Sequence, residues 1–236
     1  MYGVIHSYES LAAVDGKGLR YAVFFAGCPL RCIYCHNPDT WVMDGTKVTV
    51  SELVGKLSRY RTYFKDKGGA TFSGGEPLLQ AEFIAEMIEP LREKGIKYAI
   101  DTSGAVELSE SVKKVLDNAQ TVILDLKFWD DESYRKYTGG TIERTLKILS
   151  YLDEKNINTW VRTVVVPGIN DSEEYMDKYL SLLTGRECIE KYELLPFHTM
   201  GFFKYEKLGI ENPLIGTEAL SGVDGLQRYV NGVLFG

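Results

Sequence analysis

The sequence of 236 residues has no apolar run of the roughly 18 residues needed to cross a bilayer. Its start, "MYGVIHSYESLAAVDGKG", also lacks the basic stretch followed by an apolar one that is typical of a secretory leader. Basic residues are not in excess, because 27 Lys and Arg stand against 33 Asp and Glu, a formal net charge of -6. A broad contact with phosphate backbones needs a positive face. We therefore predict a cytoplasmic protein that binds neither membranes nor nucleic acid.

Cysteine is scarce, with four residues in the whole chain. This number is far below that of a secreted disulfide scaffold. Three of the four lie in "CPLRCIYC", residues 28–35, and only Cys188 lies elsewhere. Clustered cysteines in a cytoplasmic protein more often bind metal or take part in catalysis. We expect Cys188, near the start of a predicted strand, to be a small buried apolar side chain.

The chain also lacks Pro-rich or Ser-rich linkers and long internal repeats, so we expect one domain over residues 1–236. Short apolar segments alternate with amphipathic ones, which predicts an α/β fold with a parallel sheet. The predicted strands are 21–27, 69–75, 97–104, 121–128, 159–168 and 191–198, and the helices are 49–64, 77–95, 108–118, 141–156 and 171–185. This pattern fits either an open doubly wound sheet or a barrel that lacks its last two units.

Local signals place some of the helix ends. Ser51-Glu52 favours a helix start, Gly95 and Gly185 favour helix ends, and Pro90 predicts a kink or break in the second helix. The segment from about 199 is aromatic and without clear periodicity. We expect an irregular C-terminal extension over 199–236, with a short helix within 217–236.

Polar residues fall at the carboxyl ends of the predicted strands, where catalytic residues of such folds gather. Each of them also fits a structural role, such as a turn cap, an ion pair or a buried histidine. Because every strand shares the pattern, we expect one active site formed by the cysteine cluster, "SGGE", Asp101-Thr102, Asp125, Lys127, Arg162 and His198.

The spacing of Cys28, Cys32 and Cys35 leaves three kinds of site to consider. Structural zinc needs four ligands, and His36 follows Cys35 too closely to complete the set easily. A redox dithiol would leave Cys28 unexplained. A four-iron cluster has one cysteine position per iron, so three cysteines leave one iron open for chemistry.

"CPLRCIYC" together with the later "SGGEP" resembles the radical S-adenosylmethionine (radical SAM) superfamily. "DGKGLR", "YCHNPDTW", "LDLK" and "VVVPGIND" make the chain similar to its pyruvate formate-lyase activating enzyme family, over nearly all of residues 1–200. The resemblance implies a partial (β/α)6 barrel of the TIM type. It also implies a [4Fe-4S] cluster on Cys28, Cys32 and Cys35, whose open iron binds S-adenosylmethionine.

The resemblance further implies which residues hold S-adenosylmethionine. Gly74 and Gly75 carry no Cβ and let backbone approach its methionine end, and the Glu76 carboxylate accepts from its ammonium group. Lys127 and His198 match family positions that contact the cofactor.

A monovalent cation beside the cofactor carboxylate is implied as well. Asp125, which also helps to hold the cofactor, would supply a hard oxygen donor, as would Asp101, Thr102 and the Ile123 backbone carbonyl.

On the substrate side, Asp15 and Arg162 match family positions that face the substrate peptide. A turn-forming Asp-Gly and an ion pair inside the barrel are the structural alternatives for these two residues. Lys17 stands where the family usually has proline, a departure that would loosen this turn or alter the partner surface. His36 and Asn37 match the family's "HN" and would either tune the cluster or solvate the loop.

The implied activity is hydrogen abstraction from a glycine Cα in a loop of pyruvate formate-lyase, with flavodoxin or ferredoxin as electron donor. The activases of several other glycyl radical enzymes have a cysteine-rich ferredoxin module between the cluster loop and the glycine motif. Residues 36–72 of this chain contain no cysteine, which favours the activase of pyruvate formate-lyase. Two alternatives remain. One is a radical SAM enzyme that activates another glycyl radical enzyme or modifies a small molecule or another peptide, and the other is an iron-sulfur electron carrier.

Overall fold

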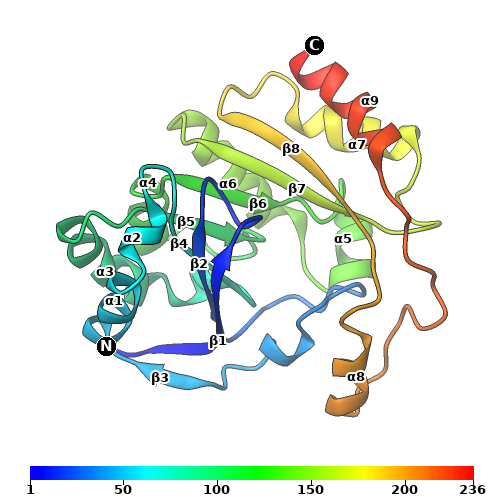
Figure 1. The fold of residues 1–236 in the computed structure, drawn as a ribbon. Coiled ribbons are helices and arrows are strands. Elements are labelled where there is room, and N and C mark those ends of the chain that lie inside the picture. The colour runs from blue at the N-terminus through cyan, green and yellow to red at the C-terminus, as the bar shows by residue number, and fades with distance from the viewer.

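The computed structural model describes residues 1–236. Its centre is one eight-stranded sheet in the order β3-β1-β2-β4-β5-β6-β7-β8 (Figure 1). The strands are β1 (Gly3–Ala12), β2 (Arg20–Phe25), β3 (Thr46–Val48), β4 (Gly69–Gly74), β5 (Tyr98–Thr102), β6 (Thr121–Asp125), β7 (Thr159–Val165) and β8 (Ile189–Pro196).

The six predicted strands are the parallel part of this sheet, from β2 to β8, and their order along the sheet follows the order of the chain. Each new strand is added on the same side of the previous one, and right-handed crossovers then place all connecting helices on one face of the sheet, as in a barrel. In a doubly wound sheet the strand order reverses partway, so helices cover both faces. The sheet does not close on itself. The fold is therefore an open partial barrel, and the doubly wound alternative is wrong.

The sequence analysis missed the two antiparallel strands, β1 and β3. β1 pairs with β2 and β3, so it extends the barrel sheet beyond its first parallel strand. Its middle residues are partly or fully exposed. With so little burial, the strand lacks the clear apolar alternation that identified the others.

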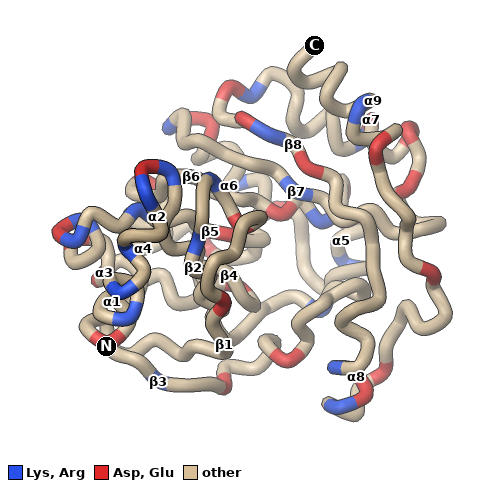
Figure 2. Tube along the Cα trace, viewed as in Figure 1, with Lys and Arg blue, Asp and Glu red and all other residues tan.

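The helices are α1 (Val50–Ser58), α2 (Arg61–Phe64), α3 (Ala81–Glu93), α4 (Glu110–Asp117), α5 (Asp131–Thr138), α6 (Ile142–Glu154), α7 (Glu173–Leu183), α8 (Phe202–Leu208) and α9 (Asp224–Phe235). Two short 3-10 turns are η1 (Pro38–Thr40) and η2 (Pro77–Gln80). Figure 2 shows acidic and basic residues interspersed along these helices. No helix is both long and apolar enough to span a membrane.

Several expected helix ends are confirmed, and others need correction. Gly95 and Gly185 follow α3 and α7 with positive φ, as expected. α1 is capped by Thr49, whose side chain forms a capping box with Glu52, so Ser51 is already inside the helix. Pro90 lies inside α3 without breaking it. The carbonyl that loses its partner belongs to the exposed Glu86, where water can satisfy it.

The C-terminal part of the chain is more regular than expected. α8 lies within 199–216, a segment without clear periodicity, while α9 is the closing helix expected within 217–236. α9 packs against α7 and β8. The core beneath these elements is one cluster of 52 buried residues.

Candidate active site

A cavity of about 220 Å³ opens at the carboxyl ends of the parallel strands. Its walls come from the cysteine loop after β2 and from the ends of β4, β5, β6 and β7. Most of the predicted site residues line it: Cys28, Cys32, Cys35, His36, Asn37, Gly74, Gly75, Asp101, Thr102, Asp125, Lys127 and Arg162. The structure thus brings together residues that are up to 134 positions apart in the chain, from Cys28 to Arg162.

The cysteine loop presents three free thiols to the cavity. Burial raises the pKa of the Cys28 thiol to about 11 and that of Cys32 to about 12. The Lys127 ammonium opposes both shifts. Cys188 is 3% exposed and lies outside the cavity, which confirms its expected role as a buried apolar side chain.

The two glycines after β4 lie where no side chain fits. Gly74 has a φ of +118°, and a Cβ there would lie 2.3 Å from the Phe25 backbone nitrogen. A Cβ on Gly75 would lie 2.2 Å from the Gly27 carbonyl oxygen. Both positions therefore need glycine for the close approach of the β4 turn to the start of the cysteine loop.

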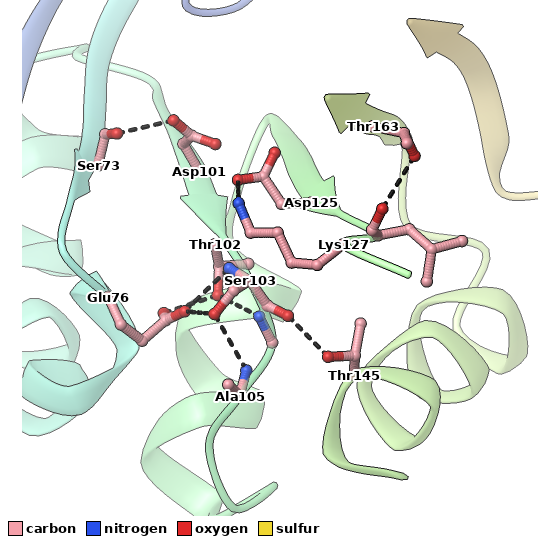
Figure 3. A network of polar contacts seen from close by, with 12 residues as sticks. Ser73, Glu76, Asp101, Thr102, Ser103, Ala105, Asp125, Lys127, Thr145 and Thr163 are labelled. Atoms are coloured by element: carbon pink, nitrogen blue, oxygen red, sulfur yellow. Dashed lines mark hydrogen bonds and ion pairs between the residues drawn. The ribbon is translucent and has the colours of Figure 1, made fainter. Parts of the chain in front are cut away.

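Glu76 turns away from the cavity, and in this respect the structure differs from the expectation. The side chain is 0% exposed and does not line the cavity. Its carboxylate accepts from the Thr102 hydroxyl at 2.6 Å and from the Ser103 hydroxyl at 2.6 Å and amide at 2.9 Å (Figure 3). It also accepts from the Leu78 amide at 3.0 Å. These four bonds occupy the acceptor positions that an ammonium group would need.

The charged centre of the cavity is formed by neighbouring strands (Figure 3). The Lys127 ammonium donates to Asp125 at 2.6 Å, and the Ser73 hydroxyl donates to Asp101 at 2.7 Å. Burial and the nearby Asp125 carboxylate raise the pKa of Asp101 to about 6, against the opposing effect of Arg162. Burial alone would lower the pKa of Lys127, but Asp125 and other neighbours raise it well above its usual value.

The four oxygen donors predicted for a monovalent cation lie on adjacent strands. Asp101 of β5 is paired in register with Ile123 of β6, whose side chain is fully buried. Asp125 is the last residue of β6. Thr102 lines the cavity, but its hydroxyl donates to Glu76. Asp101, Thr102 and Asp125 thus line the cavity, whereas Ile123 does not, and the cation site stays a prediction.

Asp15 and Arg162 lie close enough for their charges to interact. Burial raises the pKa of Asp15, and Arg162 and Arg20 oppose this effect. Arg162 donates to Glu193 at 2.9 Å and to the Val14 carbonyl, so it holds the loop that carries Asp15. Arg162 lines the cavity, whereas Asp15 does not.

His198 does not line the cavity either, but it stacks on His36 with ring centroids 3.7 Å apart. The His36 Nε2 atom is 2.9 Å from the His198 carbonyl, so this ring is turned toward β8 rather than toward the thiols. The Nδ1 atom of His198 is buried and has no hydrogen-bond partner.

Two further residues of the site were missed although they lie inside the quoted motifs. Tyr34, between Cys32 and Cys35, lines the cavity and has a buried hydroxyl without a partner. Ser73, the first residue of "SGGEP", orients Asp101. The motif position was a signal for both, but only the fold shows which side chains point inward.

The sequence from 22 to 180 matches the family model of the radical SAM superfamily. The three-cysteine loop on an open α/β barrel is thus that of a radical SAM protein. The chain is 44% identical to the pyruvate formate-lyase-activating enzyme of Clostridium pasteurianum, over 92% of either chain. It is 39% identical to the pyruvate formate-lyase 1-activating enzyme of Escherichia coli K12, over 99% of this chain and 98% of the relative. The chain belongs to the family of pyruvate formate-lyase-activating enzymes.

Solved structures agree with this fold. A domain of pyruvate-formate lyase-activating enzyme from Bacteroides vulgatus superposes with a TM-score of 0.56 at 24% identity, over 71% of this chain and 92% of the other. SuiB of Streptococcus suis, solved with S-adenosylmethionine, gives a TM-score of 0.64 at 16% identity, over 87% of this chain and 44% of the other.

The radical SAM family uses a [4Fe-4S] cluster and S-adenosylmethionine, and the residues present fit both. No three His, Cys, Asp or Glu side chains are arranged to hold a metal ion together. In a four-iron cluster each of the three cysteines ligates a different iron, which leaves the fourth iron open for the cofactor. The glycine turn and the unpartnered hydroxyl of Tyr34, which line the same cavity as the thiols, fit a polar organic molecule beside them.

Proposed function

We propose that this protein activates pyruvate formate-lyase by generating a glycyl radical in that enzyme. The observation that carries the proposal is that three free thiols and the charged residues at the strand ends line the same cavity. Near-full-length similarity to named pyruvate formate-lyase-activating enzymes supports the choice of partner.

In this proposal Cys28, Cys32 and Cys35 hold the [4Fe-4S] cluster. When bound, the cluster and S-adenosylmethionine supply the electron and the 5'-deoxyadenosyl radical that removes a hydrogen atom from the target glycine Cα. The protein's own residues position the reactants and exclude water, which is where most of its contribution to the rate lies.

Each remaining site residue has a role that follows from its place. Gly74 and Gly75 let backbone donors and acceptors approach the methionine end of the cofactor. The Lys127 ammonium, held by Asp125, is a cationic partner for the cofactor carboxylate. We assign His198, through its unpartnered Nδ1, to the cofactor as well.

On the substrate side, we propose that Arg162 and Asp15 receive the glycine loop of the partner. Arg162 is 8% exposed and is anchored by Glu193, so its guanidinium is fixed before the peptide arrives. Asp101 and Asp125, with the Thr102 and Ile123 oxygens, remain our proposed donors for a monovalent cation.

We also propose that residues 1–236 act as one cytoplasmic domain that binds neither nucleic acid nor membranes. Flavodoxin or ferredoxin is the proposed electron donor. Replacing a chemical reductant with reduced flavodoxin should support the same activation, which a radical assay checks directly.

The decisive experiment is anaerobic incubation of the protein with reductant, S-adenosylmethionine and pyruvate formate-lyase. We expect a glycine-centred doublet in the electron paramagnetic resonance spectrum. If the cluster is intact and cleaves S-adenosylmethionine but no doublet forms, the partner is another glycyl radical enzyme or another peptide. If S-adenosylmethionine leaves the cluster spectrum unchanged, the protein is an electron carrier.

Substitutions test the ligand assignment separately. Replacing Cys28, Cys32 or Cys35 with Ala should abolish reductive cleavage of S-adenosylmethionine, because a cluster bound by two thiolates is not retained. Cys188→Ala is the matched control and should keep near-normal cleavage, since Cys188 lies outside the cavity. Cleavage by any of the first three variants at the wild-type rate would refute the assignment.

A further inference from the structure

The cysteine loop contains no strand and no α-helix between β2 and η1, so its shape depends on contacts with other parts of the chain. Its first half is held by the end of α5. The Arg31 amide donates to the Thr138 carbonyl at 2.7 Å, and the Ile33 amide donates to the Tyr137 carbonyl at 2.9 Å. These bonds fix the segment that joins Cys28 to Cys35.

The second half of the loop, residues 35–39, is held from the other side by α8. Figure 1 shows this helix beside the light-blue segment that follows β2, and α8 contacts η1. The contact is made by Gly201, the N-cap residue of α8, and by Lys204 and Tyr205 within the helix. We call these three residues and their partners at 35–39 the α8 contact.

Tyr205 reaches the last cysteine of the loop. Its hydroxyl donates to the Cys35 carbonyl at 2.9 Å, and the residue is 2% exposed. The ring also packs edge-on against Trp41, with centroids 6.1 Å apart. Tyr205 therefore fixes the backbone of Cys35 at a point where the loop has no secondary structure of its own.

Lys204 and Gly201 extend the contact along the loop. The Lys204 ammonium donates to the Asn37 side-chain oxygen at 2.7 Å and to Asp39 at 3.0 Å. A Cβ on Gly201 would lie 2.8 Å from both the Cα and the carbonyl oxygen of His36, so the two backbones touch. The segment also has local turns that join Cys35 to Cys32, Thr40 to Asn37 and Trp41 to Pro38. Its other contacts outside α8 are those of His36 with His198 and of Asp39 with the His6 ring at 3.4 Å.

We propose that α8 holds Cys35 in the position that cluster binding requires, with Tyr205 and Lys204 as positioning residues. The inference rests on the proposed cluster site. It assigns a role to a segment that lies after the part of the chain matched by the superfamily model, residues 22–180. A thiol whose backbone moves freely releases its iron more readily, so the α8 contact should determine how long the cluster survives.

The test compares the rates at which a chelator of iron(II) removes the cluster from anaerobic wild-type protein and variants, followed by loss of cluster absorbance. Tyr205→Phe removes the hydroxyl but keeps the ring against Trp41, and Lys204→Met removes the ammonium. Each should lose the cluster on the order of five-fold faster, the effect of about one hydrogen bond. Lys207→Met is the matched control, because the Lys207 ammonium lies over Phe203 of the same helix rather than on the loop.

The thermal unfolding midpoint of each metal-free variant provides the second measurement. Wild-type midpoints together with faster cluster loss support the proposal. Cluster loss at the wild-type rate in Tyr205→Phe overturns it, and so does faster loss matched by Lys207→Met or by a general fall in the unfolding midpoint. If wild-type protein holds no four-iron cluster, the proposed function fails instead.

Discussion

At the scale of single residues, Glu76 shows how a motif residue can serve the site without entering it. Its buried carboxylate joins the turn after β4 to Thr102 and Ser103 at the end of β5 (Figure 3). Ser103 is in turn held by Thr145, which donates to its carbonyl at 2.8 Å. The network fixes the strand end that carries Asp101.

Glu76→Gln should therefore reduce both the stability of the protein and its affinity for S-adenosylmethionine. The Leu78 and Ser103 amides donate to different oxygens of Glu76, so the NH2 group of Gln would replace the acceptor of one of them and face a donor. A buried unsatisfied donor costs about 1 to 3 kcal/mol. Urea unfolding of the metal-free protein and cofactor titration of the holoprotein measure the two effects. Glu89→Gln on the exposed face of α3 is the control. Lost affinity at unchanged stability would mean that Glu76 turns toward the cofactor.

At the scale of elements, the starts of β2, β4 and β6 are joined by one buried cation. Arg20 is 1% exposed and donates to Thr71, to Gln120 and to the carbonyls of Lys17, Lys67 and Ala70. Burial lowers the pKa of Arg20 to about 10, with Asp15 as the opposing charge. Arg20 donates through all three of its guanidinium nitrogens, so one side chain binds acceptors on these strands and on the loops before them.

Arg20→Leu should lower the free energy of unfolding by about 3 kcal/mol or more, because the buried Ala70 carbonyl and Thr71 hydroxyl and three part-buried acceptors would lose a charged donor at once. Denaturant titration measures the change. Arg92→Leu, at an exposed i,i+3 pair on α3, should change stability by less than about 1 kcal/mol. An equal loss of unfolding free energy in the two variants would contradict the proposal that Arg20 stabilises the contacts between these strands.

At the scale of the whole molecule, the sheet does not close between its two ends, β3 and β8, and the loop between β1 and β2 contacts β8. The loop between β1 and β2 carries Lys17, whose ammonium donates to Glu190 of β8 at 2.8 Å. Arg162 of β7 binds the Val14 carbonyl of the same loop. Lysine at a position where the family usually has proline thus gives this chain a contact across the gap beside Asp15.

Lys17→Ala should loosen this loop while leaving the sheet intact. The ion pair is partly exposed, so its loss should change global stability by less than about 1 kcal/mol. Hydrogen exchange of the amides of residues 13–18 should be faster, whereas that of β4 should stay at the wild-type rate. Unchanged exchange in the loop would show that Arg162 and Arg20 hold it without Lys17.

Strands with two buried faces were the most predictable part of the fold. β2 and β6 contain almost continuous apolar runs, and such runs can be recognised without knowledge of their partners. α5 and α8 were missed because few of their residues are buried: only Tyr134 and Thr138 in α5, and only Tyr205 in α8. A helix this short has too little apolar surface to produce a clear 3.6-residue period.

The candidate site could be named from the sequence because its motifs are local. The cysteine spacing and the glycine pair each lie within a few residues, where chain geometry allows few arrangements. Their residues do line one cavity, as predicted. Glu76, His198 and Asp15 do not line it, because the direction of each side chain depends on neighbours far away in the sequence.

By itself, the sequence determined the chemistry of this protein: three thiols, a turn without side chains, and polar groups at the ends of apolar strands. Only the tertiary structure decided that the carboxylate of Glu76 is buried outside the cavity, that Lys17 contacts β8 and that α8 packs against the cysteine loop. Spacing and periodicity in the sequence restrict the conformations of residues that are close together in the chain. Contacts such as that between Tyr205 and Cys35 join residues 170 positions apart, and their geometry exists only once the strands have set the distances between them.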